Sequence, residues 1–168
     1  MGRRDFFFKW LFYALTTLLF VVVQVFGLVH IRIWGVHPFV FPVLVSTVAA
    51  LETAHESAIF ALTFGAVLDM AAPGVIPCFY TVAFLAVFFV SRVLSAKVLS
   101  GPFFCCMLCG VLSIVCTDLL QMLFLNASVS FSFRSALLLT GKELLLTLPL
   151  MPLIYLPDYR IRRIFHQE

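Results

Sequence analysis

Long apolar runs with almost no charge are the feature that most constrains how this chain can fold. Residues 10–29 contain no charged side chain, and over all 168 residues 63% are hydrophobic and only 11% are charged. Soluble domains carry about 25% charged residues, so this chain cannot cover a surface that faces water. The composition therefore predicts an integral membrane protein, and the unalternating runs predict helices rather than a closed barrel.

Short polar segments divide the chain into about six predicted transmembrane helices. They are expected at residues 10–29, 38–51, 57–72, 76–90, 102–125 and 135–156. A full crossing takes about 20 helical residues, and the second, third and fourth runs are shorter than that. The second and third runs therefore have an alternative interpretation as one re-entrant element, which leaves four crossings. Both versions predict an all-α, polytopic protein with a single transmembrane helical domain over residues 1–168.

The basic residues predict the orientation of the chain in the membrane. With both termini cytoplasmic, eight of the eleven Lys and Arg residues fall on the inner side: Arg3, Arg4, Lys9, Arg92, Lys97, Arg160, Arg162 and Arg163. The outer side receives Arg32 and Arg134, and Lys142 falls inside the last run. This bias follows the positive-inside rule for four crossings as well as for six. Basic residues in these places favour a membrane topology signal and no nucleic-acid partner.

A set of polar residues interrupts the apolar runs at a similar depth. With a rise of about 1.5 Å per residue, they fall in the outer half of the bilayer: Gln24, Asp69, Asp118, Gln121, Lys142 and Glu143. A charge at this depth costs at least about 2.5–3.5 kcal/mol unless it is paired or wetted. Lys142 is the one cation expected at this level, with Asp69, Asp118 and Glu143 as candidate anions, and we expect it to pair across helices, with Asp69 among the candidate partners. Contacts between helices, an ion or proton pathway, and a pocket for a ligand or partner all remain open for this layer.

A second polar group, made of Glu52, His55 and Glu56, is expected on one helix face at the cytoplasmic junction of two runs. Glu-x-x-His is half of a carboxylate-bridged di-metal motif, but the second copy that such a site requires is missing. The remaining interpretations are a solvated turn and a contact for a cytoplasmic partner.

The sequence offers little for catalysis. Cys105, Cys106 and Cys109 are closely spaced, but the nearest carboxylate is Asp118, so we expect these thiols to be packing residues rather than metal ligands. No nucleotide-binding loop, Ser-His-Asp arrangement or pair of acids placed for hydrolysis is recognisable. We therefore expect no enzymatic activity, no metal and no cofactor.

One segment resembles a known family. Residues 58–90, "AIFALTFGAVLDMAAPGVIPCFYTVAFLAVFFV", resemble the MreD family of bacterial rod shape-determining membrane proteins. That family has a Gly-Phe-x-x-Gly-x-x-x-Asp span followed by a small-residue turn, and Gly65, Asp69 and Gly74 match this pattern. Ala61 stands where the family has its first glycine. Prolines in the second run and the basic C-terminal tail are also similar.

The resemblance implies a non-enzymatic scaffold of the bacterial cell-elongation machinery, which directs rod shape and peptidoglycan synthesis at the plasma membrane. The implied partners are an MreC-like bitopic membrane protein, an MreB-like actin homologue and cell-wall synthases, besides the lipid bilayer. The family's fold is similar to the six-helix S-component of energy-coupling-factor vitamin transporters, so the alternative is a small-molecule (vitamin) binding subunit. The Ala-x-x-x-Ala docking motif of those subunits is absent here, because Leu18 follows Ala14 at that spacing.

Overall fold

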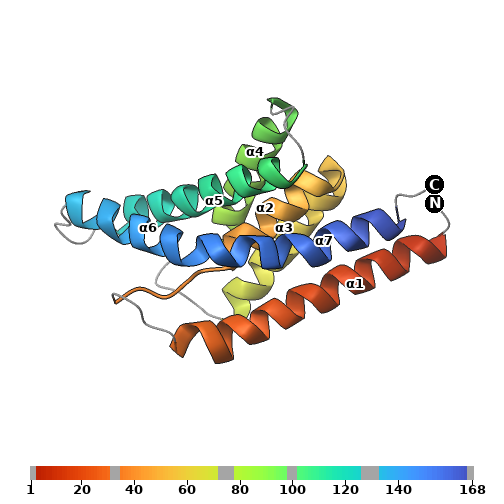
Figure 1. Ribbon diagram of the computed structural model, residues 1–168, viewed down its shortest axis with the longest axis horizontal. Coiled ribbons are helices and arrows are strands. Elements are labelled where there is room, and N and C mark those ends of the chain that lie inside the picture. Colours follow the sequence, from red (N-terminus) through yellow and green to blue (C-terminus); the bar gives the residue numbers. More distant parts are fainter. Residues whose placement is uncertain (1–2, 31–34, 72–77, 98–101, 126–132, 166–168) are drawn as a thin grey trace.

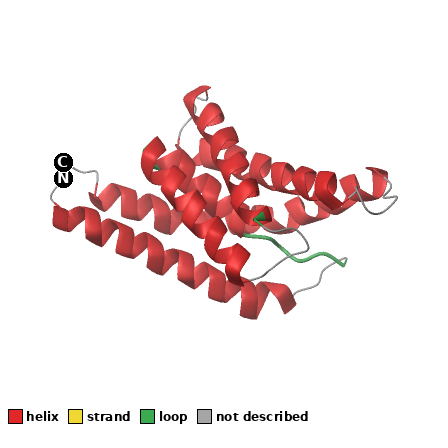
Figure 2. Cartoon of the chain, turned by 180° about the vertical axis from the view of Figure 1, so that it is seen from behind, coloured by secondary structure: helices red, strands yellow, loops and turns green. Residues whose placement is uncertain are grey.

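The computed structural model describes residues 3–30, 35–71, 78–97, 102–125 and 133–165. All regular elements within these ranges are helical, and a non-helical segment, residues 36–40, leads into the second helix (Figures 1 and 2). In chain order the elements are α1 (Arg3–Val22), the π-helical η1 (Val23–Gly27), the 3-10 helix η2 (Leu28–His30), α2 (Phe41–Leu51), α3 (Ala54–Ala71), α4 (Phe79–Lys97), α5 (Pro102–Leu125), α6 (Phe133–Thr147), the 3-10 helix η3 (Leu148–Leu150) and α7 (Met151–Phe165). The prediction of an all-α protein is confirmed for the described residues.

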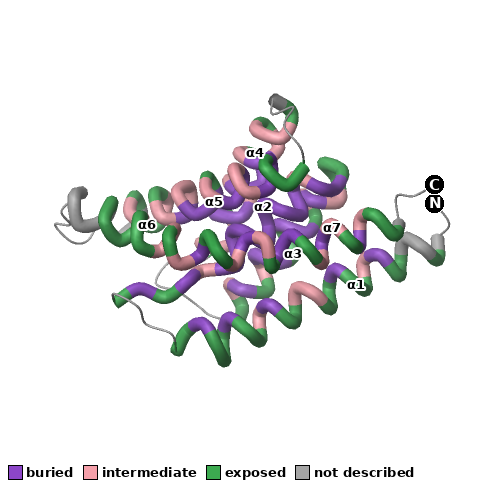
Figure 3. Tube along the Cα trace, in the orientation of Figure 1, coloured by how far each residue is buried: buried purple, intermediate pink, exposed green. Residues whose placement is uncertain are grey.

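The short helix α2 forms the centre of the molecule. It packs against α3, α4, α5 and α7, and of its eleven residues all but Ala50 are buried (Figure 3). Eleven helical residues extend only about 16 Å, which is about half of a hydrocarbon core of about 30 Å. The other helices therefore enclose α2 as a core element, and it is too short to cross a bilayer as a straight helix.

Four stretches are long and apolar enough to span a membrane: Phe7–His30, Phe79–Ala96, Pro102–Leu123 and Leu137–Ile164. The last one joins α6, η3 and α7 into one continuous rod (Figure 1). The predicted runs 38–51 and 57–72 correspond to α2 and α3, which are helical but do not belong to these four. The structure thus supports a membrane-embedded helical protein with four candidate spans.

Helices α1 and α7 bring the two ends of the chain to the same end of the molecule (Figure 1). α1 packs on α7, so its first turns lie beside the last turns of that helix. We call this the terminal end. An even number of crossings places both termini on one side of a membrane, so this arrangement is consistent with the predicted topology.

Aromatic rings join α3 and α4 to the central helix. Phe64 stacks on Phe60 and on Phe84, with ring centroids 5.8 Å and 5.5 Å apart, and Phe41 of α2 meets Phe64 edge-on at 5.5 Å. Offset-stacked and edge-to-face pairs at these separations are favourable beyond their buried area. These four rings therefore form part of the buried core between α2, α3 and α4.

Candidate functional site

A buried ionic cluster fastens three helices at the terminal end. The Lys9 ammonium contacts the Glu52 carboxylate and donates a 2.9 Å hydrogen bond to Glu56 Oε2. Tyr13 Oη, one helical turn after Lys9, donates to Glu52 Oε1 at 2.8 Å. The side chains of Lys9 and Glu52 are both 0% exposed. Burial of both charges is tolerated because each has its counter-ion and further hydrogen bonds.

The terminal-end cluster extends to α4 and α7. Arg92 of α4 donates to the Glu52 backbone carbonyl at 3.1 Å, where a cation stabilises the carbonyls at the end of α2. Asp158 of α7 is 1% exposed and shares a 3.0 Å hydrogen bond with Thr47 Oγ1 of α2. Four helices, α1, α3, α4 and α7, therefore meet near the polar end of α2, and the cluster holds their relative positions.

The interpretation of Glu52, His55 and Glu56 as a solvated turn is wrong for Glu52. That side chain is enclosed and paired with Lys9, Glu56 is half-buried on the same ammonium, and only His55 is exposed. Lys9 is the residue that sequence reasoning missed as a site residue, because it was assigned to the cytoplasmic interface. The sequence does contain a signal for this cluster. Lys9 and Tyr13 are spaced four residues apart on one helix face, and Glu52 and Glu56 have the same spacing in a segment with no other acids.

The motif Gly65–Asp69 joins α3 directly to the start of α4. Asp69 Oδ1 accepts from the Tyr80 backbone N–H at 2.9 Å, and Oδ2 accepts from the N–H and hydroxyl of Thr81 at 3.0 Å and 2.6 Å. Tyr80 and Thr81 are the second and third residues of α4, whose N–H groups have no partner within the helix. Asp69 therefore caps α4 from a neighbouring helix, with its charge at the positive end of the helix dipole.

Gly65 makes the Asp69 cap possible. A Cβ atom at this position would lie 2.7 Å from Thr81 Cα and 3.0 Å from Thr81 N, which is too close for any side chain without a backbone shift. The glycine lets the backbone of α4 approach α3, one turn before Asp69 reaches the same residue. Gly74, the third residue of the matched pattern, lies outside the described residues.

Gln24 ties the end of α1 to the segment before α2. Its Nε2 donates to the Pro38 carbonyl at 2.8 Å, and its Oε1 accepts from the Val40 N–H at 3.2 Å. The side chain is buried and lies in the π-helical η1. The Gln24 amide thus satisfies one backbone donor and one backbone acceptor of the segment that precedes α2.

The remaining polar residues of the predicted layer lie on the hairpin of α5 and α6. Asp118 hydrogen-bonds the Thr140 hydroxyl, and Glu143 is near enough to Asp118 for their charges to interact. Gln121 and Lys142 are exposed. Among the described residues no ion pair within 4.0 Å involves Lys142. The Asp69 carboxylate instead accepts hydrogen bonds from Tyr80 and Thr81 of α4. Pairing of Lys142 with Asp69, one of its candidate anions, is therefore wrong.

The six polar residues thus belong to three separate sets of contacts rather than to one site. Gln24 and Asp69 bind backbone of the chain itself, which agrees with the interpretation of the layer as contacts between helices. The set on α5 and α6 differs in that two of its members, Gln121 and Lys142, are exposed.

The closely spaced thiols lie in the packed interior. Cys105, Cys106 and Cys109 are buried on α5, Cys106 packs with Leu51 and Tyr155, and Cys109 Sγ lies 3.7 Å from the Ser91 carbonyl. Within the described ranges no group of three or more His, Cys, Asp or Glu side chains is placed to hold a metal ion.

No protein-family model, curated protein or solved structure significantly matches this chain. The resemblance to the MreD family therefore rests on the motif around Gly65 and Asp69, for which the structure supplies a physical role in joining two helices.

Proposed function

We propose that this chain is a non-enzymatic membrane scaffold of the bacterial cell-elongation machinery that acts by binding an MreC-like bitopic protein. The observation that carries the proposal is the outward face of α1. The helix is fastened near its start by Lys9 and Tyr13, and just beyond its end by Gln24 of η1. Large apolar side chains are exposed along this helix: Phe7, Phe8, Leu11, Phe12, Leu15, Leu18, Leu19 and Val22.

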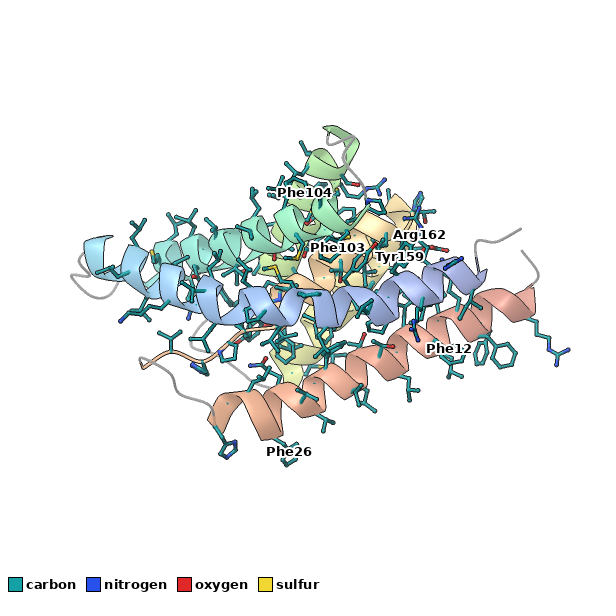
Figure 4. The ribbon with its side chains drawn as sticks, viewed as in Figure 1. Phe12, Phe26, Phe103, Phe104, Tyr159 and Arg162 are labelled. Carbon is teal, nitrogen blue, oxygen red and sulfur yellow. The ribbon has the colours of Figure 1, made fainter. Side chains whose placement is uncertain are left out.

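The α1 face offers a long docking surface for another transmembrane helix. Phe12 and, beyond α1, Phe26 of η1 point away from the rest of the molecule (Figure 4). Association of helices in lipid depends on packing over such a length, because lipid tails are as apolar as the side chains. Ala14 is exposed within this face, and its small side chain permits close approach of a second backbone.

The internal polar contacts support a scaffold over the vitamin-binding alternative. A small-molecule site needs a few convergent polar groups that are free to bind the ligand. Gln24 and Asp69, which the sequence placed at the depth of such a pocket, are engaged with backbone groups of Pro38, Val40, Tyr80 and Thr81. These contacts favour a structural role for Gln24 and Asp69, in which each side chain holds one helix to a neighbouring segment.

The proposed location is the plasma membrane, with both termini cytoplasmic. Arg4, Arg160 and Arg163 are exposed at the terminal end, where the positive-inside rule places basic residues. Reporter fusions after Gln167 and within residues 127–133, most of which lie outside the described residues, test this orientation. A C-terminal reporter that is active outside the cell would reverse the assignment.

The binding proposal is tested by photo-crosslinking in the native membrane. A photoreactive residue at Phe12 or Leu19 of α1 is expected to capture a single-span protein, whereas the matched position Val67, exposed on α3, is not. Depletion of the chain is expected to abolish rod shape, through the MreB-like actin homologue and cell-wall synthases. A stoichiometric vitamin and a copurifying ATPase module, with no bitopic partner, would instead establish the uptake alternative.

A further inference from the structure

A buried carboxyl group on α7 has no counter-ion. Asp158 is 1% exposed, and its Oδ2 lies 3.0 Å from Thr47 Oγ1 of α2. In the described part of the chain, no ion pair within 4.0 Å involves Asp158. An ionised carboxylate in such a place is costly, and a buried acid without a counter-ion commonly takes up a proton instead. The protonation state of Asp158 therefore decides whether this contact between α2 and α7 is favourable.

The hydrogen bonds of Thr47 indicate which group supplies the proton in this contact. Thr47 Oγ1 lies 2.9 Å from the Leu44 carbonyl oxygen and 3.0 Å from Asp158 Oδ2. A hydroxyl has one proton to donate, and a backbone carbonyl can only accept. Ser46 and Ser113 donate to the carbonyl three residues earlier in the same way, at 2.8 Å and 2.7 Å. With the Thr47 proton directed to Leu44, the hydrogen bond to Asp158 requires a proton on the carboxyl group.

Glu52 makes a negative charge on Asp158 still less favourable. The two carboxyl groups are close enough for their charges to interact. Lys9 is fully buried, and its ammonium already has both Glu52 and Glu56 as partners. One buried cation thus faces three acids at the terminal end, and a proton on Asp158 removes the charge that has no partner.

The remaining groups around Asp158 supply no counter-ion. Tyr13 of α1 and Cys106 of α5 are near it, and neither side chain carries a positive charge. Arg162, one turn further along α7, is half-buried and forms no ion pair within 4.0 Å in the described ranges. Arg92 of α4 donates to backbone carbonyls at the end of α2 instead. The surroundings of Asp158 therefore favour the neutral acid.

We propose that Asp158 is a proton-binding site, at which a neutral carboxylic acid donates to Thr47 Oγ1 and joins α7 to α2. When the acid ionises, its proton goes to water, the hydrogen bond to Thr47 loses its donor, and a second carboxylate stands beside Glu52. The second half of α7 then separates from the end of α2. Contact of α7 with the centre of the fold thus depends on pH. The inference does not depend on the proposed function, because it concerns a contact within the chain.

Infrared spectroscopy of the purified protein near neutral pH detects this proton directly. The C=O stretching band of a protonated carboxyl group is separate from the bands of carboxylates and amides. Asp158→Asn keeps the shape and an N–H donor for Thr47, and its spectrum is expected to lack one protonated-carboxyl band of the unsubstituted protein. Glu56→Gln is the matched control and is expected to lose carboxylate absorbance, because Glu56 is paired with Lys9. Loss of carboxylate absorbance alone in Asp158→Asn would overturn the proposal.

The pH dependence of thermal unfolding in detergent is a second, independent measurement. An aspartate exposed by unfolding is ionised above about pH 4, so unfolding releases the proton that Asp158 holds in the folded chain. Stability of the unsubstituted protein is therefore expected to fall as the pH rises, until Asp158 ionises in the folded chain as well. Asp158→Asn is expected to lack this component of the slope, whereas Glu56→Gln keeps it near neutral pH. Equal slopes for Asp158→Asn and the unsubstituted protein would show that Asp158 is already ionised in the fold, which would overturn the proposal.

Discussion

The terminal end and the α5–α6 hairpin use the same residue types in opposite ways. At the terminal end Lys9 and Glu52 are fully enclosed, and each finds its counter-ion on another helix. On the hairpin Lys142 is exposed, while Glu143 and Asp118 are half-buried beside each other. The difference lies in the number of helices that meet. Four other helices meet near the end of α2, whereas α6 packs chiefly on α5.

The degree of burial therefore distinguishes charged residues that stabilise the fold from charged residues that remain accessible at the surface. A buried ion pair whose partners are both present is satisfied internally, and breaking it leaves an uncompensated charge. A charge on an exposed helix face has no such internal requirement, so its replacement changes the fold little and changes association more. Each prediction below measures one side of this contrast.

The largest effect is expected for Lys9→Met. The variant keeps the length of the side chain but leaves Glu52 buried without its cation, which costs about 3–5 kcal/mol of unfolding free energy. Thermal unfolding of the protein in detergent measures the loss. Lys142→Met is the matched control, and we expect its unfolding temperature to stay near that of the unsubstituted protein. A similar decrease in unfolding temperature for Lys9→Met and Lys142→Met would show that the buried and the exposed lysine contribute equally to stability.

The next effect is expected for Tyr13→Phe, which removes the hydroxyl that donates to Glu52 Oε1. A hydrogen bond to a charged group contributes about 1.5–3 kcal/mol, and the phenylalanine ring still fills the buried position. We expect Tyr13→Phe to lower the unfolding temperature. When it is combined with Glu52→Gln, the loss of unfolding free energy is expected to be smaller than the sum of the two single losses. Strict additivity in this double-mutant cycle would show that Tyr13 and Glu52 act independently.

The sequence predicted the helices well because their signal is local. Runs without charge and the polar breaks between them are local features of the sequence, so α5 coincides with the predicted range 102–125. α1, α4 and the α6–α7 rod overlap their predicted ranges but extend beyond them, because these helices continue through charged residues such as Lys9, Arg92 and Arg162. The length of α2 also follows from its sequence. Its position at the centre does not, because enclosure depends on which other helices pack around it.

Partners of the polar residues were predicted less well, because pairing across helices needs three-dimensional information. Lys9 and Glu52 are separated by 43 positions in the chain, and nothing near either residue identifies the other. The rise per residue predicts that Asp69 and Lys142 lie at a similar depth in the membrane. Depth does not determine where the two residues lie in the plane of the membrane, so it cannot predict that they meet. Asp69 instead reaches the start of the next helix in sequence, a contact that the short connection after α3 makes natural.

Gly65→Ala is expected to have an intermediate effect at the α3–α4 contact. The added methyl would lie 2.7 Å from Thr81 Cα, so the two helices must move apart, at a cost of about 1–3 kcal/mol. Gly27→Ala, where no atom lies within 4 Å of the new methyl, is the control and should unfold at or above the temperature of the unsubstituted protein. Thermal unfolding of both variants measures the difference. An unchanged unfolding temperature for Gly65→Ala would mean that α4 is not packed on α3 as closely as described.

The smallest effects are expected for the cap that Asp69 provides. Asp69→Leu removes all three hydrogen bonds to the first turn of α4 and is expected to cost about 0.5–2 kcal/mol, as loss of a helix cap does. Asp69→Asn keeps one carbonyl oxygen to accept an N–H and nearly the same shape, so its loss is smaller. The ranking of the two unfolding temperatures tests the role, and the same ranking is expected for assembly with the bitopic partner. If Asn and Leu are equally harmful, the negative charge rather than the cap is what α4 requires. If both are harmless, α4 begins without help from α3, and the hydrogen bonds of Asp69 are incidental to the fold.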